Sequence, residues 1–306
     1  ESVGIRDHDY TLKLAVFHTL FNLLGLIMMT PLIGRMVIFL ERLVKAPATD
    51  RTQPMYLNEA TLEVPAAAVE AVRKELVRLY EKAFHLIAHG LSLQRGTIKS
   101  TDDLAQAVAK SRRLMPVDMD EYYERHIKPL YSDIVEFIRN AQARQLSQQE
   151  SDQLADLREA SRNIAEAVKD MKHLHKNLSR NLRTTDDALR AQYDAIRLQL
   201  ATVLREIDSI QEQAPDSDTV LSADVVALEL KEATRQREKA LDELIRKRQI
   251  SPMHATSLMN DNGYTYDISA NLVEMARQLF ASQEAELKTA EQQLALEEDD
   301  LNKLIQ

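Results

Sequence analysis

Residues 14–33 read LAVFHTLFNLLGLIMMTPLI and contain no formally charged side chain. A helix of twenty residues spans about 30 Å, which is the thickness of the hydrocarbon core of a bilayer. The apolar pattern continues more weakly past Arg35 to Leu40. The stretch therefore predicts a transmembrane helix over about 14–33, extending at most to 40, within an N-terminal segment 1–45.

Small and polar residues share one face of this predicted helix. Ala15, His18, Asn22, Gly25 and Met29 recur at spacings of three and four residues. Polar side chains cost free energy in lipid, whereas small residues let a neighbouring helix approach closely. We expect this face to pack against other membrane helices or to line an ion path. The alternative is a buried helix of a soluble core, in which the histidine is simply hydrogen-bonded.

Basic residues are distributed unevenly around the apolar stretch. Those before it are Arg6 and Lys13, and those after it are Arg35, Arg42, Lys45 and Arg51. Because Lys and Arg concentrate on the cytoplasmic side of a membrane, the region after the span is predicted to be cytoplasmic.

The rest of the chain predicts an all-α protein. Tryptophan is absent, there are six glycines, and 28% of the residues are charged. Residues 46–65 contain three prolines and no apolar period, so we expect a linker there. Residues 66–306 are predicted to form a domain of antiparallel helical bundles, divided into 66–180 and 181–306. The most regular pattern is a heptad seam, formed by Leu189, Tyr193, Ile196, Leu200, Val203, Ile207 and Ile210.

Local signals predict several helix ends. Pro65 is expected near the first position of a helix that ends between Gly90 and Gly96, and Ser147 with Glu150 resembles a capping box. A shorter helix is expected to begin near Asp103 and to be closed by Pro116. Another should begin at Asp118 or Asp120, with a kink at Pro129. The last helix is expected over roughly 253–303, with a break near 262–263.

Composition and motifs exclude several classes of function. The net charge of −9 argues against general nucleic-acid binding, and the absence of cysteine excludes disulfides and thiolate metal sites. Neither a nucleophile–His–acid set, a phosphate-binding glycine loop nor an H-E-x-x-H motif occurs. We therefore expect a protein that is not an enzyme.

Two groups of charged residues are candidate binding sites. Glu166 and Asp170 lie four residues apart on one helix face, where a divalent cation would relieve their repulsion. A solvated acidic face is the more common explanation of such a pair. A basic stripe follows, which could face anionic lipid headgroups, contact a protein partner, or simply be solvated. The basic stripe consists of Lys169, Lys172, Lys176, Arg180 and Arg183.

Three stretches resemble one protein family. The pattern Ala15-x-x-His18-x-x-Phe21-Asn22, followed by Pro31, looks like the closing membrane segment of the bacterial sodium/phosphate cotransporters. Two later stretches fit the same family, 56–66 with its YLNE and LEVPA motifs and 250–261 with its ISP and SLMND motifs. The resemblance covers nearly the whole chain but only the C-terminal part of such a transporter. The paired Gln-Ser-Ser repeats that bind sodium and phosphate in the family do not occur in this sequence.

The resemblance implies a fold and a function. The region after the span would be a cytoplasmic domain similar to the phosphate-uptake regulator PhoU, built from two three-helix bundles. In that family a Glu-x-x-x-Asp pattern ligates metal, and Glu166-x-x-x-Asp170 matches it. The chain would lie in the plasma (inner) membrane as the C-terminal portion of a transporter of sodium and phosphate. Its partners would be an upstream transporter core or a separate membrane subunit, or a second copy in a homo-oligomer. The alternatives are a PhoU-like phosphate-signalling regulator and a helical scaffold, neither with transport activity of its own.

Overall fold

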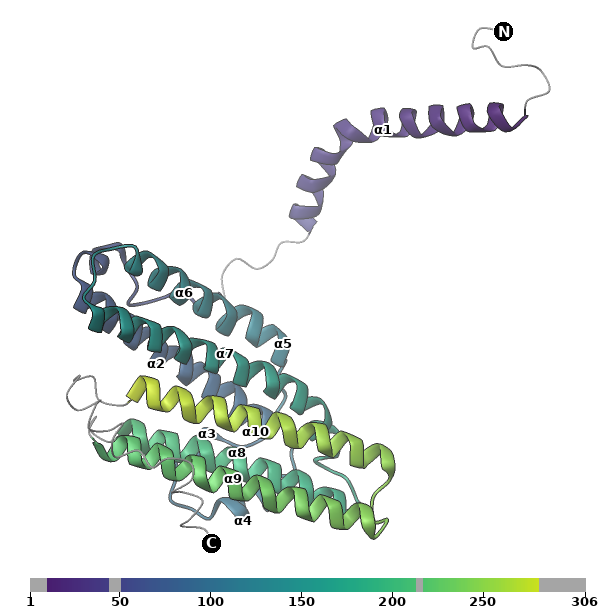
Figure 1. The fold of residues 1–306 in the computed structure, drawn as a ribbon. Helices are drawn as coiled ribbons and strands as arrows, with labels where there is room; N and C mark the ends of the chain where they lie inside the picture. The colour runs from purple at the N-terminus through teal and green to yellow at the C-terminus, as the bar shows by residue number, and fades with distance from the viewer. Residues whose placement is uncertain (1–9, 44–50, 213–216, 281–306) are drawn as a thin grey trace. The chain divides into compact units, whose positions relative to one another are not determined.

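A computed structural model describes residues 10–43, 51–212 and 217–280 (Figure 1). Within these ranges every regular element is a helix and no strand occurs. The chain divides into two compact units, Glu1–Asp50 and Arg51–Gln306. The division falls inside the predicted linker 46–65.

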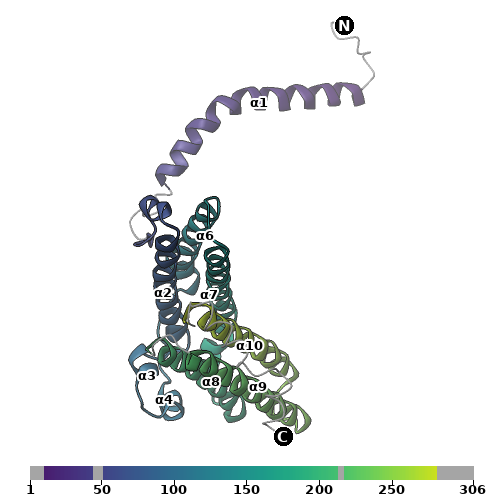
Figure 2. The ribbon, with the colours of Figure 1, turned by 60° about the vertical axis from the view of Figure 1, so that its left-hand side comes forward.

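The first unit contains one long helix, α1, over Tyr10–Leu43. Its stretch Lys13–Met36 is long and apolar enough to cross a membrane, and none of this stretch is buried. Pro31 lies inside α1, where the proline ring removes one backbone hydrogen bond, and α1 is visibly bent (Figures 1 and 2).

We call the second unit, Arg51–Gln306, the helical unit. Its first regular element is a 3-10 turn, and the other described elements are α-helices apart from one π turn. Its elements are η1 (Glu59–Glu63), α2 (Pro65–Gly90), α3 (Arg95–Lys99), α4 (Leu104–Lys110), α5 (Met119–Tyr122), the π turn η2 (Tyr123–Ile127), α6 (Lys128–Gln142), α7 (Gln148–Asn181), α8 (Asp187–Glu212), α9 (Ser217–Arg246) and α10 (Pro252–Phe280).

The long helices pack in two groups of three. Helices α2, α6 and α7 contact one another, and so do α8, α9 and α10. Helix α10 also packs along α7, so it lies between α7 and the pair α8 and α9 (Figures 1 and 2). The short helices α3 and α4 lie on α8. Because one cluster of buried apolar residues runs through all six long helices, the two groups share a continuous core.

Local sequence signals explain where these helices begin and which faces they bury. Pro65 occupies the first turn of α2, and Ser147 and Glu150 form the predicted capping box at the start of α7. Asp103 and Asp118 cap α4 and α5. The predicted heptad seam of α8 is buried along its whole length.

The structure corrects two predicted boundaries. Helix α10 runs without a break through Asn262 and Gly263, because the packing of its buried neighbours outweighs the ~1 kcal/mol by which glycine disfavours a helix. Helix α4 ends at Lys110, before Pro116. Pro129 follows the π turn η2 in a helix that runs without interruption from α5 into α6, so the irregularity predicted at Pro129 is present as that π turn. Residues 281–303 of the predicted last helix lie outside the described residues.

A fully buried arginine connects the short helices to α8. The guanidinium of Arg197 donates to the backbone carbonyls of Leu91 at 2.9 Å, Val108 at 3.0 Å and Ser111 at 3.1 Å. It also pairs with Asp194 at 3.1 Å. The connection from α2 to α4 is thereby fixed against α8, since each buried carbonyl has found a donor.

Candidate functional site

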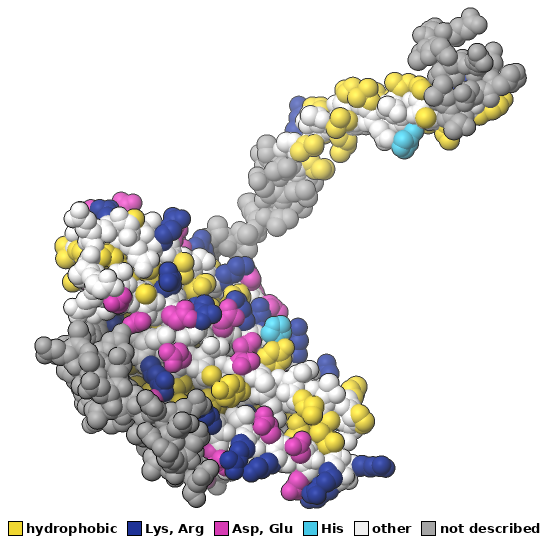
Figure 3. All heavy atoms as spheres, viewed as in Figure 1, with side chains coloured by type: hydrophobic (Ala, Val, Ile, Leu, Met, Phe, Trp, Pro, Cys, Tyr) yellow, Lys and Arg dark blue, Asp and Glu magenta, His cyan; other side chains and the backbone are white. Residues whose placement is uncertain are grey.

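The predicted membrane face is exposed in α1. Ala15, His18, Asn22 and Gly25 are all exposed, and a Cβ atom added at Gly25 would meet nothing within 4 Å. Figure 3 shows hydrophobic side chains along α1, whereas charged side chains cover much of the visible surface of the helical unit. Within the first unit α1 is a single helix, and the described side chains from Lys13 to Met36 are not buried by one another.

The segment that follows the division between the units is tied to the helical unit by a buried carboxylate. Glu75 in α2 has an exposed fraction of 0%, and its Oε2 accepts hydrogen bonds from the backbone N–H groups of Met55 and Tyr56, both at 2.8 Å. Arg78 pairs with its other oxygen. A buried carboxylate is stable only when it is paired and hydrogen-bonded. Here Arg78 of α2 supplies the paired charge, and the segment supplies the two N–H donors.

The same segment is held at its start by α6 and η2. Arg51 pairs with Asp133 at 2.9 Å, and the N–H of Thr52 donates to the carbonyl of Arg125 at 3.1 Å. The hydroxyl of Thr52 also lies 3.0 Å from Nδ1 of His126. We call residues 51–57 the docked segment. The sequence analysis did not predict this attachment. The available signal was Glu75, a charged residue that lies between Val72 and Leu79 on the apolar face of α2.

The predicted metal pair lies where α7 faces α10. Glu166 pairs with Lys169 at 2.8 Å, and both side chains are partly exposed. Burial, Asp267 and Glu166 together raise the pKa of Asp170 to about 6. Asp267 comes from α10, so the structure adds a carboxylate that helix periodicity within α7 could not reveal. Among the described residues no three His, Cys, Asp or Glu side chains are grouped so as to hold a metal ion.

The basic stripe on α7 is divided among different partners. Lys169 pairs with Glu166, and Lys172 pairs with Asp120 at 2.6 Å while lying over the ring of Tyr123. The hydrogen bond from Lys172 lowers the pKa of Asp120.

The C-terminal end of the basic stripe is more open. Lys176, Arg180 and Arg183 are exposed, and Arg183 donates to the carbonyl of Arg112 at 3.3 Å. The neighbouring His175 hydrogen-bonds the carbonyl of Gly90, and His173 stacks on Tyr264. The end of α7 thus presents cationic side chains suited to an anionic surface.

The interior of α8, α9 and α10 contains a layer of polar side chains that the heptad pattern did not predict. Tyr193 donates to Asp261 at 2.8 Å, and Asn177 donates to the other oxygen of Asp261 at 3.2 Å. Burial raises the pKa of Asp261, while these two donors oppose that shift. In α9, Arg237 donates through Nε to Asn262 at 3.2 Å.

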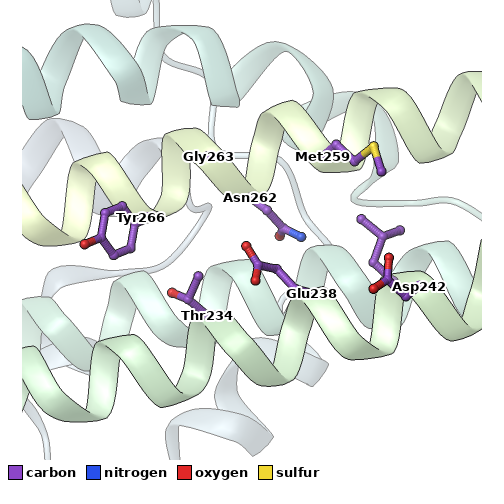
Figure 4. A pocket seen from close by; sticks show the side chains of 8 residues that line it. Thr234, Glu238, Asp242, Met259, Asn262, Gly263 and Tyr266 are labelled. Atoms are coloured by element: carbon purple, nitrogen blue, oxygen red, sulfur yellow. The ribbon is translucent and has the colours of Figure 1, made fainter. Parts of the chain in front are cut away.

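A groove between α9 and α10 opens onto this polar layer. It has a volume of about 520 Å³, and Figure 4 shows Glu238 of α9 and Asn262 of α10 pointing toward each other across it. The other lining residues are Thr234, Leu241, Asp242, Met259, Gly263 and Tyr266. The hydroxyl of Thr234 is buried without a hydrogen-bond partner among the described residues.

No family model, curated protein or solved structure matches the chain. The described residues form an all-helical fold, in which one N-terminal helix has the length and composition to span a membrane and residues 51–57 are docked on the helices of the second unit.

Proposed function

We propose that the chain is the C-terminal portion of a sodium-dependent phosphate transporter, in which α1 lies in the plasma (inner) membrane and the helical unit regulates phosphate uptake from the cytoplasm. The two groups of three helices would then correspond to the two bundles of a PhoU-like domain. The observation that carries the proposal is the exposed face of α1 formed by Ala15, His18, Asn22 and Gly25.

An exposed helix of this composition requires partners within the membrane. Hydrocarbon offers no hydrogen-bonding group to His18 or Asn22, so these side chains need donors and acceptors from neighbouring helices. Gly25 lets such a helix approach because it carries no side chain. The partner would be a transporter core, either upstream in the same protein or in a separate membrane subunit, or a second copy of this chain.

The docked segment supplies a path for regulation. Glu75, Asp133 and the carbonyl of Arg125 hold residues 51–57 to the helical unit by four contacts of 2.8–3.1 Å. Because these residues follow α1 closely in the chain, movement of the helical unit would be passed to the membrane helix through a short connection. The cationic end of α7 would face anionic lipids of the inner leaflet.

Phosphate uptake tests the proposal. The chain, expressed together with the protein segment encoded before Glu1 in bacteria lacking their own phosphate transporters, should support uptake of labelled phosphate that depends on sodium. Asn22→Leu should abolish that uptake at an unchanged level of protein in the membrane, because it removes a hydrogen-bonding group from the packed face. Leu20→Ala, which changes an exposed apolar residue off this face, is the matched control.

Uptake that is equal with and without sodium would contradict the transport proposal. So would an Asn22→Leu variant that transports phosphate as well as the Leu20→Ala control. Recovery of the full chain as a monodisperse soluble protein without detergent would favour the PhoU-like regulator instead.

A further inference from the structure

Two histidines occupy consecutive turns of α2 near its C-terminal end. His85 and His89 are four residues apart, so their side chains project from the same face of the helix. Their ring centroids lie 4.2 Å apart, and the ring planes are inclined to each other by 43°. His85 is exposed and His89 is partly buried, so the pair is open to solvent.

The backbone that carries the two histidines is held firmly in place. Residues 86–88, which lie between them, are fully buried in the core. The carbonyl of Ile87 accepts a hydrogen bond from the N–H of Leu91 at 2.9 Å, and that of His89 accepts one from Ser92 at 2.8 Å. The two imidazoles are therefore kept one helical turn apart before any ligand binds, which lowers the entropic cost of binding.

The ring nitrogens of the pair are available to a ligand. No hydrogen bond joins either ring to another of the described residues. Burial and the positive charges of His89, Arg95 and Lys82 lower the pKa of His85 below its ordinary value of 6.5. The ring of His85 is therefore neutral at neutral pH and keeps one nitrogen lone pair, which is the form that ligates metal ions.

The surroundings of the pair favour one class of metal ion. Glu81, one turn before His85 on the same face, is paired with Arg95. Calcium and magnesium need several oxygen ligands, whereas imidazole nitrogen suits zinc, nickel and copper. The positive charges of Lys82 and Arg95 oppose a cation that is held by charge alone, so the ion must be held by coordinate bonds to nitrogen.

We propose that His85 and His89 together bind a divalent transition-metal ion of the class that imidazole prefers, Zn²⁺, Ni²⁺ or Cu²⁺. Each histidine donates one ring nitrogen, at about 2.0–2.1 Å for zinc, and water molecules occupy the remaining positions. Two protein ligands are consistent with the absence of any group of three ligating side chains among the described residues. The site shares no residue with Glu166 and Asp170 or with the exposed face of α1, so it does not depend on the proposed transport function.

Isothermal titration calorimetry of the full chain in detergent with zinc chloride tests this site. His85→Gln and His89→Gln should each weaken zinc binding at least tenfold, because a single histidine cannot chelate the ion. His254→Gln, which changes a partly exposed histidine on α10, is the matched control and should leave zinc binding unchanged. Circular dichroism should show the same helical content in all three variants.

A further variant and a set of competitors separate metal ligation from folding. His89→Cys keeps a zinc ligand at the same position, so it should retain the zinc binding that His89→Gln loses. The chain contains no other cysteine with which this residue could form a disulfide. Nickel chloride should displace zinc, whereas calcium and magnesium chloride in large excess should not.

Several results would overturn the proposal. They are an unaltered chain that binds no zinc, undiminished binding in His85→Gln or His89→Gln, and a loss in His254→Gln as large as in those two variants. Equal losses in His89→Cys and His89→Gln, or displacement of zinc by calcium, would overturn it as well.

Discussion

The hydroxyl of Tyr193 in α8 donates a hydrogen bond to the carboxylate of Asp261 in α10 at 2.8 Å, and both side chains are buried. This bond joins two helices of the second group at a point where an apolar core would be expected. Asn177 of α7 donates to the same carboxylate, so Asp261 of α10 is bonded to both α7 and α8.

Tyr193→Phe tests this connection. The substitution leaves one oxygen of Asp261 buried with one donor fewer, which should lower the free energy of unfolding by about 1–2 kcal/mol. Chemical denaturation followed by circular dichroism measures the change. Tyr266→Phe, which alters an exposed tyrosine, should change the free energy by no more than about 0.5 kcal/mol. Equal effects of the two substitutions would show that the buried hydrogen bond contributes nothing.

The same tyrosine predicts a loss of stability in alkali. Burial and the neighbouring Asp261 raise the pKa of Tyr193 far above its ordinary value of 10.0. The unfolded chain therefore releases this proton near pH 10 while the folded chain retains it, so stability is lost as the pH rises above about 10. Thermal melts from pH 9 to 11 should show a smaller decline in Tyr193→Phe than in the unchanged protein. A parallel decline would show that Tyr193 ionises alike in both states.

Removal of the Glu75 carboxylate should release the docked segment. Glu75→Ala leaves the N–H groups of Met55 and Tyr56 without their acceptor, which disfavours the docked state by about 1–3 kcal/mol. Trypsin should then cleave after Arg51 several times faster, and amide exchange at Met55 should accelerate. Glu70→Ala, which removes an exposed carboxylate paired with Lys74 on the same helix, should leave both rates unchanged. Identical cleavage of the two variants would contradict the role of Glu75.

Much of the fold could be predicted from the sequence because its signals are local. The capping box at Ser147, the proline at the start of α2 and the heptad seam of α8 depend only on residues within one or two turns. These features depend on backbone hydrogen bonding and on the burial of one helix face. They can therefore be predicted without knowing which helices pack together.

The polar contacts could not be predicted in the same way because they join distant elements. Asp267 reaches Asp170 only when α10 packs on α7, and Asp261 reaches Tyr193 only across the second group of helices. The burial of Arg237 could have been predicted. Arg237 follows Val226, Leu230 and Ala233 at helical spacing, so it lies on the same face of α9 as these apolar residues. Such interruptions of an apolar stripe mark functional or structural polar sites.

Arg197 should be among the most sensitive positions of the helical unit. Arg197→Met removes donors from three buried carbonyls and should lower the free energy of unfolding by about 3–5 kcal/mol. Arg197→Lys should restore little of this loss, because an ammonium cannot reproduce the planar fork. Arg190→Met, which removes a partly exposed pair with Asp187, should change the free energy by less than about 1 kcal/mol. Urea denaturation compares them, and full rescue by lysine would contradict the proposed geometry.

Asp170 should make the helical unit less stable at neutral pH than at pH 4. Its folded pKa of about 6 exceeds the ordinary value of 3.8, so the protonated form is favoured in the folded state. The stabilisation is complete below about pH 4 and is lost as the pH rises to 6. Because the side chain is partly exposed, screening reduces the effect to about 1 kcal/mol or less.

The variant Asp170→Asn should therefore stabilise the unit at pH 7 and flatten the change in melting temperature between pH 4 and 6. The charged groups around this site are Asp267, Glu166, His173 and Lys169. Calorimetric titration with calcium tests for the predicted cation at Glu166 and Asp170. Heat of binding that becomes smaller in Glu166→Gln would support this cation site. An unchanged pH dependence in Asp170→Asn would contradict the assigned pKa.

Membrane fractionation of the full chain tests the central claim most directly. After expression in bacteria and extraction of the membranes with alkaline carbonate, the account predicts that the intact chain remains in the pellet and requires detergent for release. A variant with Leu20 and Leu24 both replaced by Arg should leave the pellet, because each charge at the centre of the span costs about 2.5–3.5 kcal/mol. Recovery of the unaltered chain in the carbonate supernatant, as a monodisperse protein without detergent, would contradict the account.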